Sequence, residues 1–598
     1  MEFLRTFKEF LQKLKNQPNQ EKVLNDLEGS VWVSYSMPET LSLIRAIALG
    51  LQTIGFKKGD TALIFAHPSS KWTIVDFAIK SIGGVSVPVF INISPENFEF
   101  QARQTEAKYI FVDGTHISDI AYQKRVLADN KSLFTSIIPM NNTPDYKLSF
   151  DKLAVMGFLE HEKSPALFDE LVDNVKAEDM ACVVYTSGST GVPKGAEYSH
   201  ERILAFSRSH FFGINETDRF LSVLPLAHIY GYIMNQASLF FNVQIYFIND
   251  VKMLSQAAKE IHPTIIIVVP RLLEKLYTKL LTNIENQGFM KKTLGTWAFE
   301  LAKHDDGHDQ DYFTKHLLHS FADMLIYSKF REVLGGAIRI MISGSAPLSP
   351  LLQNFFNSVG IPIYEGYGMT EACPITINQQ GARRVGSVGR PLKVFDVRVS
   401  DEGELHVKGI ATMSRYYKNP EATAKMLTED MWLKTGDKVR IDSDGYVYIV
   451  GRLKEVYKTS TGEFVVPVPI EQELIKAPLI EMATVIAEGR KFTSVLLFPE
   501  KEVLHSIKKA HNAEDVSDEE FLRSDFIKTE TDNLIAEINK HLNKCEQILE
   551  YRYVPTSLTV ESGELTPTLK IRRDVVTQKY AKLIDSMYNQ EVNYGSST

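Results

Sequence analysis

The feature that most constrains the fold is a series of short apolar runs, bounded by Gly, Pro or Asp, in the first 345 residues. The runs are DTALIFAH (60–67), GGVSVPVF (83–90), AKYIFVDG (107–114), MACVVYTSG (180–188), RFLSVLPLAH (219–228), VQIYFIND (243–250), PTIIIVVP (263–270) and IRIMISGS (338–345). Segments with helical periodicity, such as residues 71–82 and 96–106, lie between many of them. Strands that alternate with helices predict an α/β fold with largely parallel sheets.

The pattern changes at two points farther along the chain. Residues 271–335 are charged and helical in character, which predicts an inserted helical lobe. Beyond residue 384, short β patterns such as VFDVRVS and DGYVYIVGR dominate, and a compact segment follows Arg452. We therefore predict a large domain over residues 1–452, a hinge at 453–454 and a small C-terminal domain over 455–598.

Charge and cysteine content exclude several classes of protein. The net charge of −8 comes without a Lys/Arg stripe large enough for a nucleic-acid footprint, so no nucleic-acid partner is expected. Cys182, Cys373 and Cys545 provide neither a disulfide framework nor zinc-ligand spacing, which favours a reducing, cytoplasmic location. No stretch of the sequence reaches the ~18–20 apolar residues of a membrane span.

The N-terminal segment MEFLRTFKEFLQKLKNQ predicts an amphipathic helix, with its apolar residues on one face and its basic residues elsewhere. Charges interrupt it throughout, so it does not read as a signal peptide. Two placements remain open for this helix. It either docks on the body of the protein or makes peripheral contact with a membrane through residues 1–16.

Residues 185–195, YTSGSTGVPKG, concentrate glycines, hydroxyl side chains and one lysine after a strand-like run. Backbone N–H groups in such a turn can form a nest for an anion, and phosphate is the expected guest. The Walker pattern GxxxxGK[ST] does not fit, because Pro193 precedes Lys194 and Gly195 follows it. The segment therefore predicts a phosphate loop of another design, and a surface loop without a ligand is the alternative.

Further motifs follow in order: SGSAPLS (343–349), YEGYGMTE (364–371), WLKTGD (432–437), GRLKEVYKTSTGE (451–463) and LTPTLKIRR (565–573). Together with the glycine-rich loop, they resemble the AMP-forming acyl-CoA synthetases of the adenylate-forming superfamily, and most of all the long-chain fatty acyl-CoA synthetases. The resemblance covers most of the chain. It implies an α/β fold in which a large N-terminal domain of βαβ-layered sheets plus a distorted β-barrel carries a small mobile α+β C-terminal domain.

The same resemblance implies the reaction and its small-molecule substrates: a fatty acid, ATP with Mg²⁺, and CoA. The fatty-acid carboxylate attacks the α-phosphate of ATP, which releases pyrophosphate and gives acyl-AMP. The thiol of CoA then attacks the acyl carbon, and AMP leaves. Both steps develop negative charge, so positioned cations and hydrogen-bond donors are the expected catalysts.

The motifs carry the nucleotide roles that the resemblance implies. The β- and γ-phosphates are expected at Thr186, Ser187, Gly188, Ser189, Thr190, Gly191 and Lys194. The nucleotide is also expected to meet Glu365, Gly366, Tyr367 and Gly368, with the ring of Tyr367 against adenine. Asp437 is expected to accept hydrogen bonds from the ribose hydroxyls, with Arg452 nearby. Gly344, Ser345 and Ala346 should border the acyl or nucleotide pocket.

The expected catalytic residues come from three motifs. Lys570 matches the adenylation lysine, although Leu569 stands before it where other branches of the superfamily have glycine. Thr370 should bind the α-phosphate, and Glu371, with Thr186, should hold Mg²⁺. His228, in LPLAHIYG, should shape or gate the acyl site, and a satisfied core histidine is the alternative for that position.

The resemblance also implies that the C-terminal domain rotates between the two steps. Lys454 occupies the hinge position. Rotation would withdraw Lys570 and bring Lys458 and Gly462 to the path of the pantetheine arm of CoA, while closure excludes water.

Two other functions stay open at this point. A fatty acyl-AMP ligase would pass the chain to a carrier protein, but the extra insertion that such enzymes usually carry cannot be located in this sequence. A non-catalytic nucleotide-binding scaffold is disfavoured, because every motif residue that catalysis needs is present.

Overall fold

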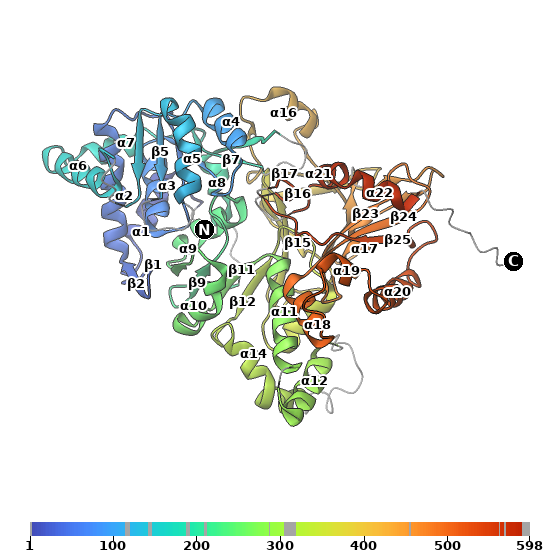
Figure 1. The fold of residues 1–598 in the computed structure, drawn as a ribbon. Helices are drawn as coiled ribbons and strands as arrows, with labels where there is room; N and C mark the ends of the chain where they lie inside the picture. Colours follow the sequence, from blue (N-terminus) through green and yellow to red (C-terminus); the bar gives the residue numbers. More distant parts are fainter. Residues whose placement is uncertain are drawn as a thin grey trace.

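The computed structural model describes residues 3–113, 120–141, 146–186, 192–208, 212–285, 287–303, 318–453, 456–560, 562–566 and 570–588, and every structural statement below concerns these residues. Figure 1 shows an N-terminal α/β body, a helical lobe beneath it and a C-terminal region beside both. Among the described helices, none combines the length and apolar composition needed to cross a lipid bilayer.

Two large sheets form the N-terminal body, and most of their strands pair in parallel, as predicted. The nine-stranded sheet has the order β15 (Arg390–Pro391), β14 (Ala372–Ile377), β13 (Ile363–Met369), β12 (Ile340–Ser343), β11 (Ile265–Val268), β9 (Arg219–Ser222), β10 (Gln244–Phe247), β1 (Leu24–Glu28) and β2 (Val31–Tyr35). The seven-stranded sheet has the order β18 (Arg415–Tyr416), β8 (Gly195–Ser199), β7 (Met180–Tyr185), β4 (Val85–Pro88), β3 (Thr61–Phe65), β5 (Tyr109–Val112) and β6 (Ser136–Pro139). By contrast, β7 with β8 and β13 with β14 pair antiparallel. Every apolar run singled out in the sequence contains one of these strands.

Helices cover the faces of the two sheets (Figure 1). They are α2 (Met37–Thr53), α3 (Ser70–Ser81), α4 (Pro95–Thr105), α5 (Ile120–Asn130), α6 (Phe150–Lys163), α7 (Leu167–Asp173), α8 (His200–Ile203), α9 (Ile229–Phe240), α10 (Leu254–Ile261), α15 (Pro350–Ser358) and α16 (Pro420–Met426). Several begin at side-chain caps: Ser36 and Glu39 form a capping box at α2, and Ser69 accepts a hydrogen bond from the backbone N–H of Trp72 at α3.

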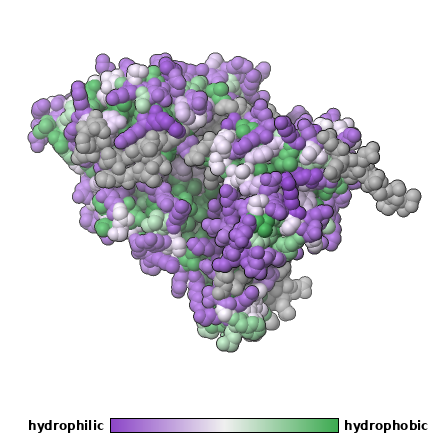
Figure 2. Space-filling view, viewed as in Figure 1, coloured by the Kyte–Doolittle hydropathy of each residue, from purple (hydrophilic) through white to green (hydrophobic). Residues whose placement is uncertain are grey.

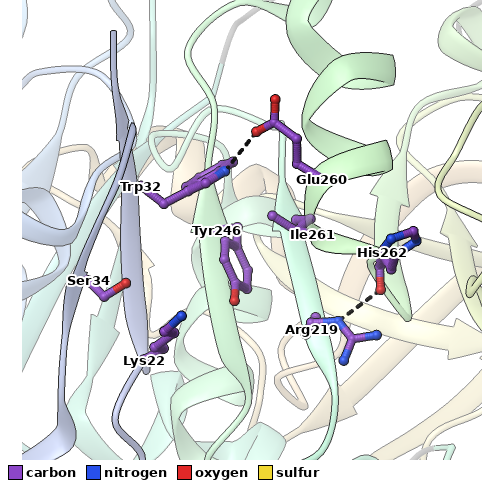
Figure 3. Close-up of a pocket in the computed structure, with 8 residues that line it drawn as sticks. All are labelled: Lys22, Trp32, Ser34, Arg219, Tyr246, Glu260, Ile261 and His262. Carbon is purple, nitrogen blue, oxygen red and sulfur yellow. Dashed lines mark hydrogen bonds between the residues drawn. The ribbon is translucent and has the colours of Figure 1, made fainter. Parts of the chain in front are cut away.

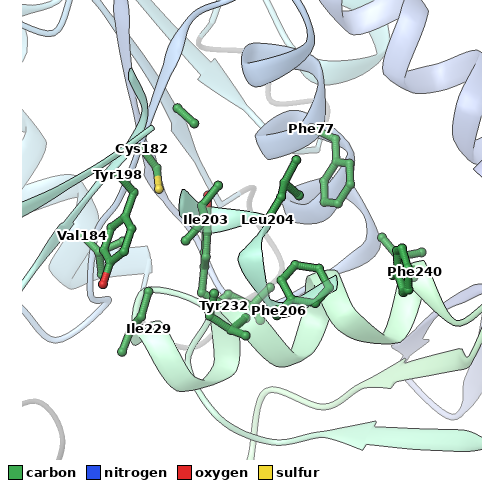
Figure 4. Packing of buried hydrophobic residues seen from close by; sticks show 14 of the residues in the cluster. Phe77, Cys182, Val184, Tyr198, Ile203, Leu204, Phe206, Ile229, Tyr232 and Phe240 are labelled. Carbon is green, nitrogen blue, oxygen red and sulfur yellow. The ribbon is translucent and has the colours of Figure 1, made fainter. Parts of the chain in front are cut away.

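A shared apolar core joins the two sheets. Figure 4 shows part of it, with Phe77 of α3, Tyr198 of β8, and Tyr232 and Phe240 of α9 among its members. The cluster therefore draws side chains from helices and strands of both sheets. Burial on this scale is the dominant stabilising contribution to such a body.

The helical lobe is a long crossover between two neighbouring strands. It leaves β11 and returns to β12 through α11 (Pro270–Glu285), α12 (Phe289–Lys303), the π-helical turn η4 (Asp323–Tyr327) and α14 (Ser328–Glu332). The lobe has its own buried cluster, which it shares with β11 and α15. Figure 2 shows apolar surface at its tip, where Phe289 and Met290 are 86% and 84% exposed.

Residues 395–452 contain a four-stranded antiparallel sheet, in the part of the chain where short β patterns were predicted. Its order is β16 (Phe395–Val399), β17 (Glu404–Gly409), β19 (Leu433–Ile441) and β20 (Val447–Arg452). The sheet follows β15 directly in the chain and contributes to the core of the N-terminal body through Phe395, Leu405 and Val447.

The C-terminal region is α+β, as expected. It contains the hairpin β21 (Tyr457–Lys458) and β22 (Phe464–Val465), the sheet β23 (Ile480–Ile486), β24 (Thr493–Pro499) and β25 (Ile548–Tyr553), and the helices α17 (Pro467–Leu474), α18 (Lys501–Ala510), α19 (Asp518–Phe521), α20 (Asp525–Asn539), α21 (Arg573–Lys579) and α22 (Ala581–Tyr588). Its buried clusters draw on residues after position 456, so the region has a core of its own.

The N-terminal helix α1 (Phe7–Lys15) docks on the body, which settles one of the two placements left open by the sequence. Phe7, Phe10 and Leu14 are fully buried. The ring of Phe7 meets that of Phe77 edge-on at 5.2 Å, and the ammonium of the buried Lys80 lies 4.1 Å from its centroid. The apolar face of α1 is therefore part of the core and is not available to a membrane.

This docking predicts unequal effects of substitution along the segment. Phe10→Ala should lower the free energy of unfolding by about 3–5 kcal/mol, because it leaves a cavity where an aromatic side chain is fully enclosed. The matched change Phe3→Ala, at a side chain that is 54% exposed, should cost under about 0.5 kcal/mol. Urea unfolding followed by circular dichroism measures both, and equal losses would contradict the docked placement.

Candidate functional site

The YEGYGMTE motif forms a tight hairpin between β13 and β14. Met369 pairs with Ala372, so Thr370 and Glu371 are the two turn residues. A Cβ atom on Gly368 would lie 3.0 Å from the carbonyl oxygen of Ala372, so the hairpin needs glycine at this position. The motif therefore holds Thr370 and Glu371 at the end of a strand of the nine-stranded sheet.

Asp437 connects this hairpin to the four-stranded sheet. Its carboxylate accepts a hydrogen bond from the Tyr367 hydroxyl at 2.5 Å and one from Nε of Arg452 at 3.0 Å. Arg452 stands opposite Asp437 in the β19–β20 pair, which fixes that geometry. A carboxylate has about four acceptor positions, so capacity remains for hydroxyl groups of a ligand. The structure thus brings together Tyr367, Asp437 and Arg452, which the resemblance assigns to the nucleotide.

Glu371 connects the same hairpin to the seven-stranded sheet. Its carboxylate accepts a short hydrogen bond from the hydroxyl of Tyr416, on β18. Burial raises the pKa of Glu371 above its usual value, while the Tyr416 hydrogen bond and the charges of Lys194 and Arg452 oppose that rise. The ammonium of Lys194 also lies 5.5 Å from the centroid of the Tyr416 ring. A buried carboxylate therefore sits between two cations.

The glycine-rich loop starts and ends beside these residues. The backbone N–H of Thr186 donates to the carbonyl of Lys194 at 2.9 Å, which closes the loop where β7 and β8 meet. Ser187, Gly188, Ser189, Thr190 and Gly191 lie outside the described residues. The described ends place the loop against the Glu371 hairpin, since Lys194 acts on that carboxylate.

His228 lies within reach of the positive charge of Lys570. His228 caps α9, and its Nδ1 accepts a hydrogen bond from the backbone N–H of Tyr230 at 3.2 Å. Burial and the positive charge of Lys570 lower the pKa of His228 to about 3. The imidazole is therefore neutral near pH 7, and its Nε2–H is left as a donor. Lys570 lies on the C-terminal region and is exposed, and its charge acts on His228 of the N-terminal body.

The SGSAPLS segment borders the site with little bulk. Gly344 is buried, and a Cβ atom there would lie 3.2 Å from the carbonyl of Gly366. Ser345 has a positive φ of 70°. Glu365 accepts from the backbone N–H of Leu348 at 3.3 Å, and burial raises the pKa of Glu365 to about 8. Glu365 thus fixes this segment through its hydrogen bond with Leu348, and Ala346 of the same segment is exposed.

Lys458 and Gly462 stand apart from this group. The ammonium of Lys458 lies 5.9 Å from the ring centroid of Phe464, and its backbone N–H donates to Glu488. Gly462 has a φ of 88° in the turn that joins β21 and β22. Lys454, the expected hinge residue, lies outside the described residues. The roles of Lys454, Lys458 and Gly462 therefore stay predictions.

Sequence reasoning missed two tyrosines that position the turn. Tyr416 binds Glu371, and the hydroxyl of Tyr198 donates to the carbonyl of Thr370 at 2.7 Å. Both come from strands of the other sheet, so no local pattern points to them. The only signal in the sequence was the aromatic residue itself, which is also what an ordinary core position shows.

A separate cavity lies across the body from these residues. Figure 3 shows it between β2, β10 and the end of α10, lined by Lys22, Trp32, Ser34, Arg219, Tyr246, Glu260, Ile261 and His262. None of the residues expected at the site from sequence lines it. The candidate site is therefore the junction of the hairpin, the loop ends and Lys570.

The chemistry available at this junction is cationic. Lys194, Arg452 and Lys570 supply positive charge, Thr370 supplies a hydroxyl group, and the buried Glu371 supplies a carboxylate. Among the described residues there is no cluster of three or more His, Cys, Asp or Glu side chains that could enclose a metal ion by itself. One carboxylate suits Mg²⁺ that takes its remaining ligands from phosphates and water. Such an arrangement can bind a nucleoside triphosphate and stabilise charge developing on phosphorus.

Comparison with known families agrees with this geometry. The profile described as AMP-binding enzyme matches residues 10–417, and the profile described as AMP-binding enzyme C-terminal domain matches residues 455–592.

Relatives and solved structures are similar over nearly the whole chain. The chain is 31% identical to the long-chain-fatty-acid–CoA ligase FadD15 of Mycobacterium bovis over 578 residues, which cover 94% of each chain. It is 27% identical to long-chain-fatty-acid–CoA ligase 1 of Cavia porcellus, over 93% of this chain and 82% of that one. Its fold resembles the adenylation domain of a carboxylate reductase from Mycobacterium chelonae, with a TM-score of 0.72, 20% identity and coverage of 98% and 90%. It also resembles the anthranilate CoA ligase AuaEII in complex with anthranoyl-AMP, with a TM-score of 0.68, 17% identity and coverage of 98% and 99%.

The site geometry predicts a histidine that stays neutral in mildly acidic solution. Nitrogen-detected NMR of histidine-labelled protein, assigned with His228→Gln, should show His228 uncharged down to about pH 4, because its pKa is held near 3. Lys570→Gln should raise this pKa by removing a nearby positive charge, whereas Lys570→Arg should leave it in place. A normal titration of His228 in the unsubstituted protein would show that Lys570 and burial do not act on it.

Proposed function

Because this chain belongs to the family of AMP-binding enzymes, we propose that the junction described above activates a long-chain fatty acid with ATP and transfers the acyl group to CoA. The observation that carries the proposal is the hairpin that joins Tyr367 to Asp437 and Glu371 to Tyr416, while the charge of Lys570, from the C-terminal region, acts on His228. Long-chain-fatty-acid–CoA ligases that match over most of this chain support the choice of substrates. The products are fatty acyl-CoA, AMP and pyrophosphate.

In the first step, a carboxylate oxygen of the fatty acid forms a bond to the α-phosphorus of ATP, and the bond from that phosphorus to pyrophosphate breaks. We assign Lys194 and the loop 186–191 to the β- and γ-phosphates. Lys570 and Thr370 then act on the α-phosphate and the incoming carboxylate, which repel each other until a cation lies between them. No proton has to move in this step, which agrees with a site built from cations rather than from a general base.

We place the nucleoside at the Tyr367–Asp437–Arg452 group. Asp437 is 5% exposed, and its carboxylate is held by two partners, so it is pre-organised to accept from the ribose hydroxyls. The Tyr367 hydroxyl already donates to Asp437, which directs its ring along the same face. Gly366 and Gly368 let the base approach the hairpin backbone.

Glu371 is the residue that we assign to Mg²⁺, with Thr186 as a further oxygen donor. When bound, Mg²⁺ neutralises phosphate charge and orients the leaving pyrophosphate. Burial raises the pKa of Glu371, and the hydrogen bond from Tyr416 together with Lys194 and Arg452 counters that rise, so these three residues favour the ionised form that a metal needs.

The second step requires a different set of residues at the acyl carbon. The CoA thiol loses its proton to solvent and attacks the carbonyl, and AMP leaves with the electron pair of the broken bond. We propose that the region after the hinge at 453–454 rotates as a small domain (455–598) on the large one (1–452), and that Lys458 and Gly462 then line the pantetheine path. The neutral His228 and the small residues 344–346 border the acyl chain without adding charge.

We propose a cytoplasmic location for the enzyme. Cys182, Cys373 and Cys545 are all free thiols, which supports a cytoplasmic location. Peripheral membrane contact through residues 1–16 would have to use the exposed Phe3 and the basic side chains, because the apolar face of α1 is buried. A carrier protein as acyl acceptor has less support than CoA, because the relatives over the full chain are named as CoA ligases.

A test of this function measures AMP release from ATP and CoA with saturated fatty acids across a range of chain lengths. We expect a maximum at long chains. Lys570→Ala should lower the rate from free acid by at least about a hundredfold, since it removes a cation from the transition state, but should leave the transfer from synthetic acyl-AMP to CoA nearly unchanged. A maximum with short or aromatic acids would overturn the substrate, and activity only with carrier proteins would overturn the acceptor.

A second prediction concerns pH. Tyr416→Phe removes a hydrogen bond that favours the ionised form of Glu371, so the pKa of Glu371 should rise further and the acid limb of the rate profile should move to higher pH. The loss of activity should therefore be largest at low pH and smallest at high pH. Pyrophosphate exchange at saturating Mg²⁺ measures this profile, with Tyr417→Phe as the matched control. A loss that is the same at every pH would contradict this role for Tyr416.

A further inference from the structure

Arg271 joins the helical lobe to the C-terminal region. It is the second residue of α11, and its guanidinium lies 2.7 Å from the carboxylate of Glu481 and 3.3 Å from that of Glu500. Glu481 lies on β23, and Glu500 immediately precedes α18. Figure 1 shows α11 and α18 side by side, which agrees with these contacts.

Arg271, the residue of the lobe that makes this contact, lies close to the candidate site along the chain. Arg271 follows β11 by three positions, and the carbonyl of Val268, at the end of β11, accepts from the backbone N–H of Gly344. The C-terminal region that Arg271 contacts also carries Lys570, whose charge acts on His228. The arrangement in which Arg271 is paired is therefore the one in which the charge of Lys570 reaches His228.

We propose that Arg271 is a positioning residue that latches the C-terminal region in the arrangement for the first half-reaction. The inference rests on the proposed function and deepens it by naming the residue that sets the balance between the two half-reactions. Release of the Glu481 and Glu500 pairs is then part of the rotation that admits CoA.

The positive charge of Arg271 explains why this single residue can hold the C-terminal region in place. Arg271 also pairs with Glu274 of its own helix at 3.1 Å, so one guanidinium neutralises carboxylates from both sides of the contact. Without it, Glu274 would face Glu481 and Glu500 across the contact, and like charges there repel. The side chains of Arg271, Glu481 and Glu500 are only 20%, 19% and 25% exposed, so solvent screens them less than it screens a surface pair.

The local environment supports a contact that depends on Arg271. Burial and the neighbouring Glu481 raise the pKa of Glu500, while Arg271 and Lys275 act in the opposite direction. The ionised forms of Glu481 and Glu500 are therefore unfavourable at this position unless a cation from the lobe lies beside them. While the contact is closed, the opposite charges attract each other. When it opens, water hydrates the charged groups on both sides.

Rates of the two half-reactions, measured separately, distinguish a positioning role of Arg271 from a general effect on stability. Arg271→Ala should lower the fatty-acid-dependent pyrophosphate exchange about tenfold, because the competent arrangement becomes a minor population. It should leave the transfer from synthetic acyl-AMP to CoA unchanged or faster. Glu274→Gln is the matched control, since it removes a partner within α11 and should affect neither step by more than about twofold. Reversing the pair with Arg271→Glu and Glu481→Arg together should recover exchange relative to Arg271→Glu alone.

Two outcomes would overturn the latch: an equal loss in both half-reactions, or no loss in either. A second measurement does not depend on activity. Spin labels attached through noncanonical side chains at Thr293 and Asn533, which are exposed on α12 and α20, report the distance between the two regions by pulsed EPR. We expect one narrow distribution in the unsubstituted protein and a broader or shifted one with Arg271→Ala.

The two measurements also separate failure of the latch from failure of the function. If the unsubstituted protein supports no pyrophosphate exchange with any fatty acid, the proposed function fails, and the EPR distances alone decide on the latch. If exchange is normal and the distances are the same with and without Arg271, the latch fails and the function stands.

Discussion

The hairpin of residues 363–377 is the constraint on which the rest of the site depends, because three sheets meet at it. Its strands belong to the nine-stranded sheet. Tyr367 ties it to Asp437 of the four-stranded sheet, and Glu371 ties it to Tyr416 of the seven-stranded sheet. A shift of any sheet would therefore move the carboxylate that we assign to Mg²⁺. This explains why the site needs the whole large domain to be folded, although its motif is only eight residues long.

Burial sets the protonation states at this junction so that the site carries a net positive charge near pH 7. Burial raises the pKa of Glu365 to about 8, so this carboxyl is neutral and serves as a structural partner of Leu348. Burial and Lys570 hold the pKa of His228 near 3, so the imidazole adds no charge of its own. Lys194, Arg452 and Lys570 then outnumber the carboxylates of Asp437 and Glu371 by one charge. A site that must bring a fatty-acid carboxylate and a triphosphate together gains from this imbalance, because both reactants are anions.

The sequence predicted most of the fold. Apolar runs such as residues 265–268 identify strands because a buried strand is locally rich in apolar residues, whereas Asp437 and Glu371 were singled out by the resemblance of their motifs to those of the acyl-CoA synthetases. The N-terminal helix was ambiguous, since the same amphipathic pattern suits a core and a membrane; only the placement of Phe77 and Lys80 decided it. Tyr416 and Arg271 escaped prediction, because their partners lie 45 and 210 residues away along the chain. No local pattern encodes a contact of that kind.

The nature of the contact between the helical lobe and the C-terminal region fits a part that has to move. The C-terminal region encloses its own apolar clusters, so opening the contact does not expose a core. An ionic contact at the boundary loses its Coulomb attraction on opening but regains hydration on both sides, and the net difference is a small one. Substrate binding can supply a coupling free energy of about 1–3 kcal/mol, which is enough to shift such an equilibrium. An apolar boundary of the same size between the lobe and the C-terminal region would be costly to open. The C-terminal region would then stay in one arrangement, and only one of the two half-reactions could use the site. The chemistry of two successive steps at one acyl carbon therefore favours a boundary held by charge.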